Sequence, residues 1–218
     1  MATEGYNSPS RVENDDSIGT SLWESETNDG TTAADLTAAT QSSNNVDAAT
    51  VSGIDSSNPS VYLYSSQYHF GIPAGATITG VELQYECEGT MASKDNSIKL
   101  VLGGGSYAGS DENAEASTAW NYSGDSTQTR GTSSDLWGFS ATTQLTPTAV
   151  NSSKFGSVIS AGRYGGGTPT PRVDHIQMKI HYTASTDFVA STGMSYWIGR
   201  GAIKNTSLKI GVHLGGSL

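Results

Sequence analysis

The fold of this chain is decided by residues 70–86, Phe70-Gly-Ile-Pro-Ala-Gly-Ala-Thr-Ile-Thr-Gly-Val-Glu-Leu-Gln-Tyr-Glu86. A turn with proline and glycine leads straight into a strand in which two kinds of residue alternate. The apolar positions are Val81, Leu83, Tyr85 and Cys87, and between them lie Glu82, Gln84, Glu86 and Glu88. A period of two is typical of an antiparallel strand with one buried face. We therefore expect a β-sandwich in which the acidic face of this strand is a soluble exterior.

The composition agrees with many short strands joined by polar loops. Of the 218 residues 35% are hydrophobic and 15% charged, and 26 are glycine. Strong helix formers are scarce, whereas Thr, Val, Ile and Tyr alternate with turn residues. A β-sandwich of this length commonly folds as one unit. We predict an all-β protein built as a single antiparallel, jelly-roll-like β-sandwich.

The net charge of the chain limits the classes of molecule that it is expected to bind. A net charge of −10 and a pI near 4.6 disfavour nucleic acid and an anionic membrane as partners, because both would repel an acidic surface.

The first residues contain no basic and apolar segments of a signal peptide, and no stretch approaches 18 apolar residues. We therefore expect synthesis in a cytoplasm without export by the usual signal.

The sandwich is predicted over residues 17–184, with additions at both ends. Residues 1–16 have few apolar side chains and are expected to be an N-terminal arm, free or docked on a neighbour. Residues 185–218 are expected to be a C-terminal extension that adds a strand to the sandwich or to another subunit. That possible assembly strand carries Leu208, Ile210, Val212 and Leu214.

Within the sandwich, period-two patterns and turn residues place the strands. Strands are predicted at 17–23, 61–69, 77–88, 97–102, 135–142, 155–161 and 173–182, with a weaker one near 46–54. A turn is expected at Lys94-Asp-Asn96 and at Asn28-Asp29-Gly30. Residues 146–151 suit a helical turn with Thr146 as N-cap and Pro147 at the first position. Residues 106–134 are predicted to be a long connection of the kind that carries recognition.

Nothing in the sequence indicates catalysis, a metal site or a cofactor. The histidines are His69, His175, His181 and His213, and none has a second histidine at metal-ligand spacing. His175 and His181 are six residues apart on one predicted strand, which separates them by about 20 Å. We expect exposed or hydrogen-bonded histidines and a buried structural thiol at Cys87. Acidic loops at 14–16, 28–29 and 110–113 lack the spacing of an EF-hand, so solvated turns are favoured over calcium sites.

Aromatic side chains near loops are the candidate contacts for a glycan or a protein partner. Aromatic rings can stack on sugar rings, as they do in carbohydrate-binding modules. Trp23 and Trp137 lie in predicted strands and are expected to be core anchors. The remaining candidates are Trp120, Tyr122, Tyr164 and Trp197.

Several segments taken in order resemble a β-sandwich domain that recurs in structural proteins of tailed bacteriophages. They are Trp23 with Asn28-Asp-Gly30, residues 70–81, Leu100-Val-Leu-Gly-Gly104, Asp135-Leu-Trp-Gly138, Asn151-Ser-Ser-Lys-Phe-Gly156 and residues 173–182. The resemblance covers residues 17–184, whereas the arm and the extension lie outside it. It implies a non-enzymatic virion component on the head or tail surface.

We therefore expect a capsid decoration or cement protein on the head exterior. It would form a symmetric homo-oligomer, with a trimer favoured, and bind the major capsid protein or a tail protein. One alternative is a tail fibre, collar or baseplate component that contacts a host glycan through residues 106–134. The other is a free carbohydrate-binding module.

Overall fold

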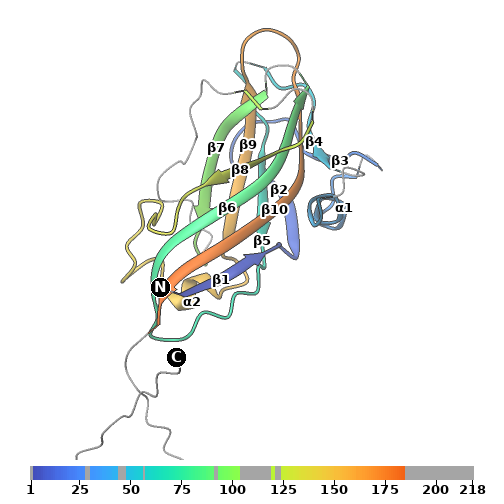
Figure 1. Ribbon diagram of the computed structural model, residues 1–218. Helices are drawn as coiled ribbons and strands as arrows, with labels where there is room; N and C mark the ends of the chain where they lie inside the picture. Colours follow the sequence, from blue (N-terminus) through green and yellow to red (C-terminus); the bar gives the residue numbers. More distant parts are fainter. Residues whose placement is uncertain are drawn as a thin grey trace, which may run out of the picture. The chain divides into compact units, whose positions relative to one another are not determined.

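A computed structural model describes the chain over residues 2–27, 30–43, 48–55, 57–90, 93–103, 119–120 and 124–184 (Figure 1). Contacts divide the chain into two compact units, residues 1–185 and 186–218. The described residues all belong to the first unit. Their helices are all too short or too polar to cross a membrane.

The described part of the chain is an antiparallel sandwich of two sheets. The large sheet has the order β3-β4-β10-β6-β8, and β1 also pairs with β10. Its strands are β1 (Ala2–Asn7), β3 (Glu24–Ser25), β4 (Ala49–Thr50), β6 (Thr77–Thr90), β8 (Ser126–Arg130) and β10 (Thr170–Thr183). The small sheet has the order β2-β5-β9-β7, with strands β2 (Arg11–Asp15), β5 (Tyr62–Ser66), β7 (Ser93–Val101) and β9 (Gly156–Arg163).

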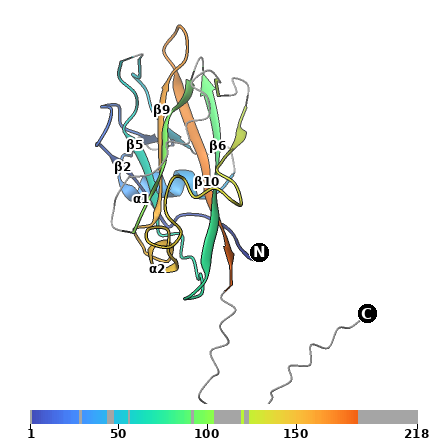
Figure 2. The ribbon, with the colours of Figure 1, turned by 90° about the vertical axis from the view of Figure 1, so that its left-hand side faces the viewer.

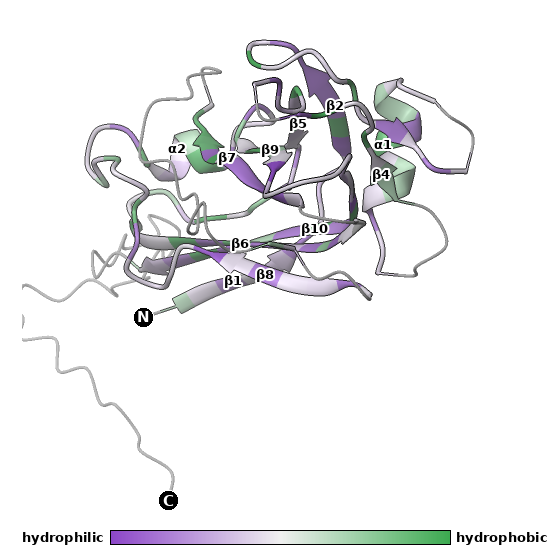
Figure 3. Cartoon of the chain, turned by 90° about the horizontal axis from the view of Figure 1, so that it is seen from above, coloured by the Kyte–Doolittle hydropathy of each residue, from purple (hydrophilic) through white to green (hydrophobic). Residues whose placement is uncertain are grey.

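From β5 onward the chain crosses between the sheets at every connection. β5, β7 and β9 belong to the small sheet, and β6, β8 and β10 belong to the large sheet. Figures 2 and 3 show the two layers, with β6 and β10 in one and β5 and β9 in the other. This alternation confirms the all-β, jelly-roll-like sandwich predicted from the sequence. Buried aliphatic and aromatic side chains from both sheets fill the space between the layers.

The strand that predicted the fold is β6, and it lies next to the long strand β10 in the large sheet. Val81, Leu83, Tyr85 and Cys87 are at most 1% exposed. The acidic and amide residues between them are partly covered. β6 and β10 pair over nearly their whole length, from Thr77 with Thr183 to Thr90 with Thr170. The predicted alternation of β10 is confirmed as well, because Ile176, Met178 and Ile180 are fully buried.

The N-terminal residues are strands of the sandwich, not the arm predicted for residues 1–16. β1 pairs with β10, where Ala2 lies opposite Tyr182, and β2 pairs with β5, where Val12 lies opposite Ser65. Backbone pairing with existing sheet edges orders this segment, although its few apolar side chains could not do so alone. Val12 is fully buried. The described sandwich therefore begins at residue 2 instead of residue 17.

Two predicted strands are loops, because side chains take over the pairing of the backbone. At 17–23 the side chain of Asn14 bonds both the N–H and the C=O of Trp23, at 2.9 Å each. At 135–142 the Asp135 carboxylate accepts a bond from the Trp137 N–H, and Trp137 has a φ of 55°, which no strand allows. Both tryptophans are still fully buried core anchors, as predicted.

The loop that carries Trp137 lies against β6 at Gly80. A Cβ added to Gly80 would lie 2.3 Å from the Thr132 carbonyl oxygen. The indole N–H of Trp137 donates to the Val81 carbonyl at 3.0 Å. Glycine is therefore required where the loop crosses this strand.

The turn expected at Lys94-Asp-Asn96 is also wrong, since these residues belong to β7. Asp95 and Asn96 are turn formers, but here their side chains bond to other elements of the fold.

Two short helices complete the described fold. α1 (Ala33–Thr40) was not predicted, yet Thr32 and Asp35 form a capping box at its start. Those two residues, followed by Leu36, are the sequence signal that was missed. α2 (Pro147–Val150) is the predicted helical turn, and the Thr146 side chain accepts a bond from the Ala149 N–H.

Several predictions fall outside the described residues. They concern Tyr122, Trp197, the assembly strand at 208–214, most of the connection at 106–134, and the turn at 28–29.

Candidate functional site

The outer face of the large sheet carries two columns of polar side chains, one on β6 and one on β10. Register places Glu86 opposite His175, Gln84 opposite Gln177, and Glu82 opposite Lys179. Because side chains alternate along a strand, these residues share the face that points away from the core. The face lies between β8 on one side and β1 on the other (Figure 1).

One end of this face is an ion-paired cluster around Glu82. Its carboxylate accepts bonds from Lys179 at 2.7 Å, from His181 at 2.8 Å and from the Tyr6 hydroxyl at 2.9 Å. Burial alone raises the pKa of Glu82, but the hydrogen bonds from Lys179, Tyr6 and His181 outweigh it and hold the pKa below its ordinary value. The cluster fastens β1 to the sheet through Tyr6.

The other end is closed by Arg172. Its guanidinium binds Glu88 on the neighbouring strand at 2.6 Å and also binds Glu26. The prediction that the acidic face of β6 is a soluble exterior is therefore wrong at both ends of this face. Glu82 and Glu88 are only 16% and 19% exposed and are paired with cations from β10.

Between these ends lies a polar groove of about 210 Å³. Gln177 donates to the side-chain oxygen of Gln84 at 2.8 Å, and His175 is 3.1 Å from the Ser8 hydroxyl. The Tyr85 side chain points into the core, so the groove meets its backbone. The polar groove is lined by Ser43, Gln84, Tyr85, Glu86, Thr127, His175 and Gln177.

A carboxylate oxygen without a hydrogen-bond partner distinguishes this groove from larger hollows on the described surface. The Oε2 atom of Glu86 is shielded from solvent and has no hydrogen-bond partner among the described residues. Hollows of about 330, 340 and 500 Å³ border α1, the small sheet and α2. None of those three is lined by a residue with such an atom. A buried polar group without a protein partner is costly, so it is one that a water molecule or a ligand would satisfy.

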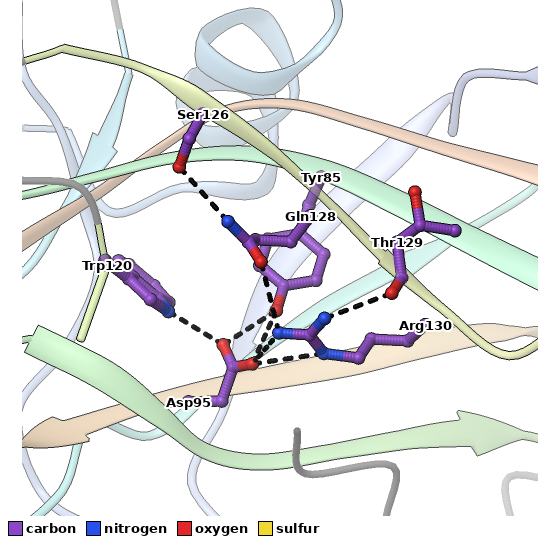
Figure 4. A network of polar contacts seen from close by, with 7 residues as sticks. All are labelled: Tyr85, Asp95, Trp120, Ser126, Gln128, Thr129 and Arg130. Carbon is purple, nitrogen blue, oxygen red and sulfur yellow. Dashed lines mark hydrogen bonds and ion pairs between the residues drawn. The ribbon is translucent and has the colours of Figure 1, made fainter. Parts of the chain in front are cut away.

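Trp120 is not a surface platform, contrary to its prediction as a contact residue. It is 5% exposed, and its indole N–H donates to Asp95 at 2.8 Å (Figure 4). Asp95 also accepts bonds from the Tyr85 hydroxyl at 2.7 Å and from Arg130. Asp95 belongs to the small sheet, whereas Tyr85 and Arg130 belong to the large sheet, so this network ties the two layers together.

Of the two predicted aromatic contacts that the structure describes, Trp120 and Tyr164, the second is accessible. It is 40% exposed and follows β9 directly, in the segment that leads to β10. It does not line the polar groove. The structure therefore does not bring the predicted aromatic contacts together within the described residues.

The described histidines are hydrogen-bonded, and Cys87 is buried. His69 lies 3.1 Å from the Ser10 hydroxyl, and His175 and His181 have the partners given above. Cys87 is fully buried, and burial together with the charge of Asp95 raises the pKa of its thiol. Over the described ranges no three His, Cys, Asp or Glu side chains are grouped so that they could hold a metal ion.

The groove residues were not predicted as a site. The alternation of β6 and β10 places Gln84, Glu86, His175 and Gln177 on the polar face, but only the register brings the two columns side by side. The sequence signal that could have indicated the groove is the run of polar residues on one face of each of these two strands.

Comparison with known proteins gives a slight likeness to carbohydrate-binding modules. The sequence matches no protein-family model and no curated protein. A chain from a study of CBM4 structure and function is 17% identical, with a TM-score of 0.34, and the match covers 60% of this chain and 82% of that one. The CBM22-1 xylan-binding domain of Xyn10C from Paenibacillus barcinonensis is 11% identical, with a TM-score of 0.37 and coverage of 82% and 99%. Neither likeness is close enough to transfer a ligand or a binding residue.

Proposed function

We propose that this chain is a non-catalytic binding module that holds a glycan in the polar groove of the large sheet. The observation that carries the proposal is the floor of the groove, where Gln84, Glu86, His175 and Gln177 lie together on two paired strands. A glycan is a chain of hydroxyl groups, each of which both donates and accepts hydrogen bonds. Amide, carboxylate and imidazole groups provide the matching donors and acceptors.

The bonds inside the groove leave groups for a ligand. The contact between the two glutamines uses one N–H of Gln177 and the oxygen of Gln84. As far as the described residues go, the amide nitrogen of Gln84 and the side-chain oxygen of Gln177 are then available to a sugar. This contact also holds both side chains in place, so that little conformational freedom is lost when a ligand binds.

The strands beneath the groove make it rigid. β6 and β10 are paired along nearly their whole length, and their inner faces are fully buried. Binding groups on paired strands are positioned more accurately than groups on loops. In this proposal the ligand is selected by hydrogen bonds and not by aromatic stacking. Tyr85 lines the groove with its backbone, and its ring is buried in the core.

The place of the module on a particle stays a prediction that rests on the sequence resemblance. A decoration protein was expected to dock through arms, but Ala2–Asn7 and Arg11–Asp15 form β1 and β2 of its own sandwich. The alternatives that include a glycan contact are a tail fibre, collar or baseplate component and a free carbohydrate-binding module. They agree better with the polar groove. Homo-oligomer formation and a capsid or tail partner likewise stay predictions.

A glycan array probed with the full chain tests the proposed function, followed by calorimetric titration of the best ligand. The double variant Gln84→Ala/Gln177→Ala should lose binding. The matched control Lys99→Ala changes β7 on the opposite sheet and should bind like the wild type. Equal binding by the double variant and the wild type would refute the assignment to the groove. An array without any bound sugar would refute the function itself.

A further inference from the structure

The polar groove has one carboxylate among the residues that line it, that of Glu86. Glu86 lines the groove, and its Oε2 atom receives no hydrogen bond within the described residues. The charges of Glu86, Glu88 and Asp174 all act on the carboxyl group of Asp125. Burial raises the pKa of Asp125, and the charges of Asp174, Glu88 and Glu86 raise it further, against the opposing effect of Arg172. These carboxylates therefore act on one another across the same end of the sheet.

The arginine and the lysine of this face are already paired with other carboxylates. Arg172 binds Glu26 and Glu88, and Lys179 binds Glu82. Neither cation is among the residues that line the groove. The groove thus presents a negative charge that the protein balances only in part, on a chain with a net charge of −10.

A ligand that enters this groove changes the charge balance. An anionic sugar, such as a uronic acid, would bring a like charge to Glu86 and lose affinity. A neutral sugar could satisfy hydrogen bonds but would not compensate the charge. An ammonium group would do both, because charge-assisted hydrogen bonds to a carboxylate are about twice as strong as neutral ones.

We infer that the polar groove selects amino sugars with a free ammonium group, of the glucosamine type, over neutral and acidic sugars. This inference rests on the proposed function and names its ligand class. Glu86 is the specificity-determining residue, and Gln84 and Gln177 hold the sugar hydroxyls on either strand. Glu86 thus distinguishes ligands by their charge, and the two glutamines distinguish them by their hydroxyl groups.

The test is a calorimetric titration of the full chain with three β-linked oligosaccharides of equal length. They are a glucosamine oligomer, a neutral glucose oligomer and a glucuronate oligomer, at a pH at which the amine is protonated. The glucosamine oligomer should bind about tenfold or more tightly than the neutral one. The glucuronate oligomer should bind most weakly. The N-acetylated oligomer, which lacks the charge, should behave like the neutral sugar.

The variant Glu86→Gln assigns the preference to one residue. It keeps the shape of the side chain and should bring the glucosamine and neutral oligomers to equal affinity. Glu13→Gln removes one charge from the small sheet and should keep the preference, which separates a local effect from that of the net charge. Thermal unfolding of both variants checks that they are folded.

The possible outcomes are distinct. Equal affinity of the wild type for glucosamine and neutral oligomers would overturn the amino-sugar inference and leave glycan binding standing. A preference that persists in Glu86→Gln would overturn the assignment to this carboxylate. Absence of binding to every oligosaccharide would overturn the proposed function and the inference with it.

Discussion

The buried network at Asp95 should be the most sensitive polar feature of this sandwich. Asp95 is 3% exposed and accepts hydrogen bonds from Tyr85, Trp120 and Arg130 (Figure 4). Asp95→Ala would remove every one of these acceptors at once. The Arg130 side chain is only 12% exposed, so its charge would stay in place without a partner.

The expected magnitude follows from that burial. Removal of one partner from a buried ion pair costs about 3–5 kcal/mol, because an uncompensated charge is left behind. Domains are stable by about 5–15 kcal/mol, so this variant would lose a large share of its stability. The double variant Asp95→Ala/Arg130→Met should recover part of the loss, since it removes the unpaired charge as well.

Urea unfolding followed by tryptophan fluorescence would measure the free energy of unfolding. The matched control is Glu13→Ala, which breaks the Arg11–Glu13 pair at 2.6 Å, where both side chains are far more exposed. An exposed pair of this kind contributes about 0–1 kcal/mol. If Asp95→Ala costs no more than the control, or if the double variant costs as much as Asp95→Ala, the proposed link between the sheets would be refuted.

Three further predictions concern other parts of the sandwich. Cys87 should resist alkylation in the folded protein and react in urea, because burial raises the pKa of its thiol; fast labelling of the native state would contradict this. The lowered pKa of Glu82 means that its contribution to stability is present above the ordinary pKa of about 4.3 and is lost as the pH falls through the lower folded value. Glu82→Gln should therefore destabilise the protein more at about pH 7 than at about pH 3, as measured by urea unfolding, and equal losses would argue against the cluster. Gly80→Ala should cost about 1–3 kcal/mol because its Cβ would meet the Thr132 carbonyl, whereas Gly166→Ala, with nothing within 4 Å, should be nearly neutral.

Much of the architecture could be predicted from period-two patterns. β6 and β10 were predicted almost in full, because one face of each is continuously apolar and the other polar. The helical turn at α2 was predicted from Thr146 and Pro147, whose roles are local. These elements have in common that their residues determine the structure without help from distant segments.

The errors arise where distant partners decide the structure. β1 and β2 have too little apolar surface to fold alone and are ordered by pairing with β10 and β5. The segment before Trp23 is a loop because Asn14 bonds to its backbone. Trp120 sits near a loop in the sequence, but the carboxylate of Asp95 holds it in the interior. None of these contacts could be inferred from neighbouring residues.

The candidate site shows the same limit. Each of Gln84, Glu86, His175 and Gln177 could be placed on a polar face from its own strand. Their meeting in one groove depends on the register of β6 against β10, which includes a bulge between Val173 and His175. Sequence spacing alone does not give that register, so a polar strand face was interpreted as solvated surface.

The most direct test of the account is calorimetric titration of the glucosamine oligomer into the wild type and the Gln84→Ala/Gln177→Ala variant. If the polar groove is the binding site, the wild type should show saturable binding. The variant should lose binding although its melting temperature equals that of the wild type. Undiminished binding by that folded variant would contradict the central claim that the outer face of the large sheet is the binding site.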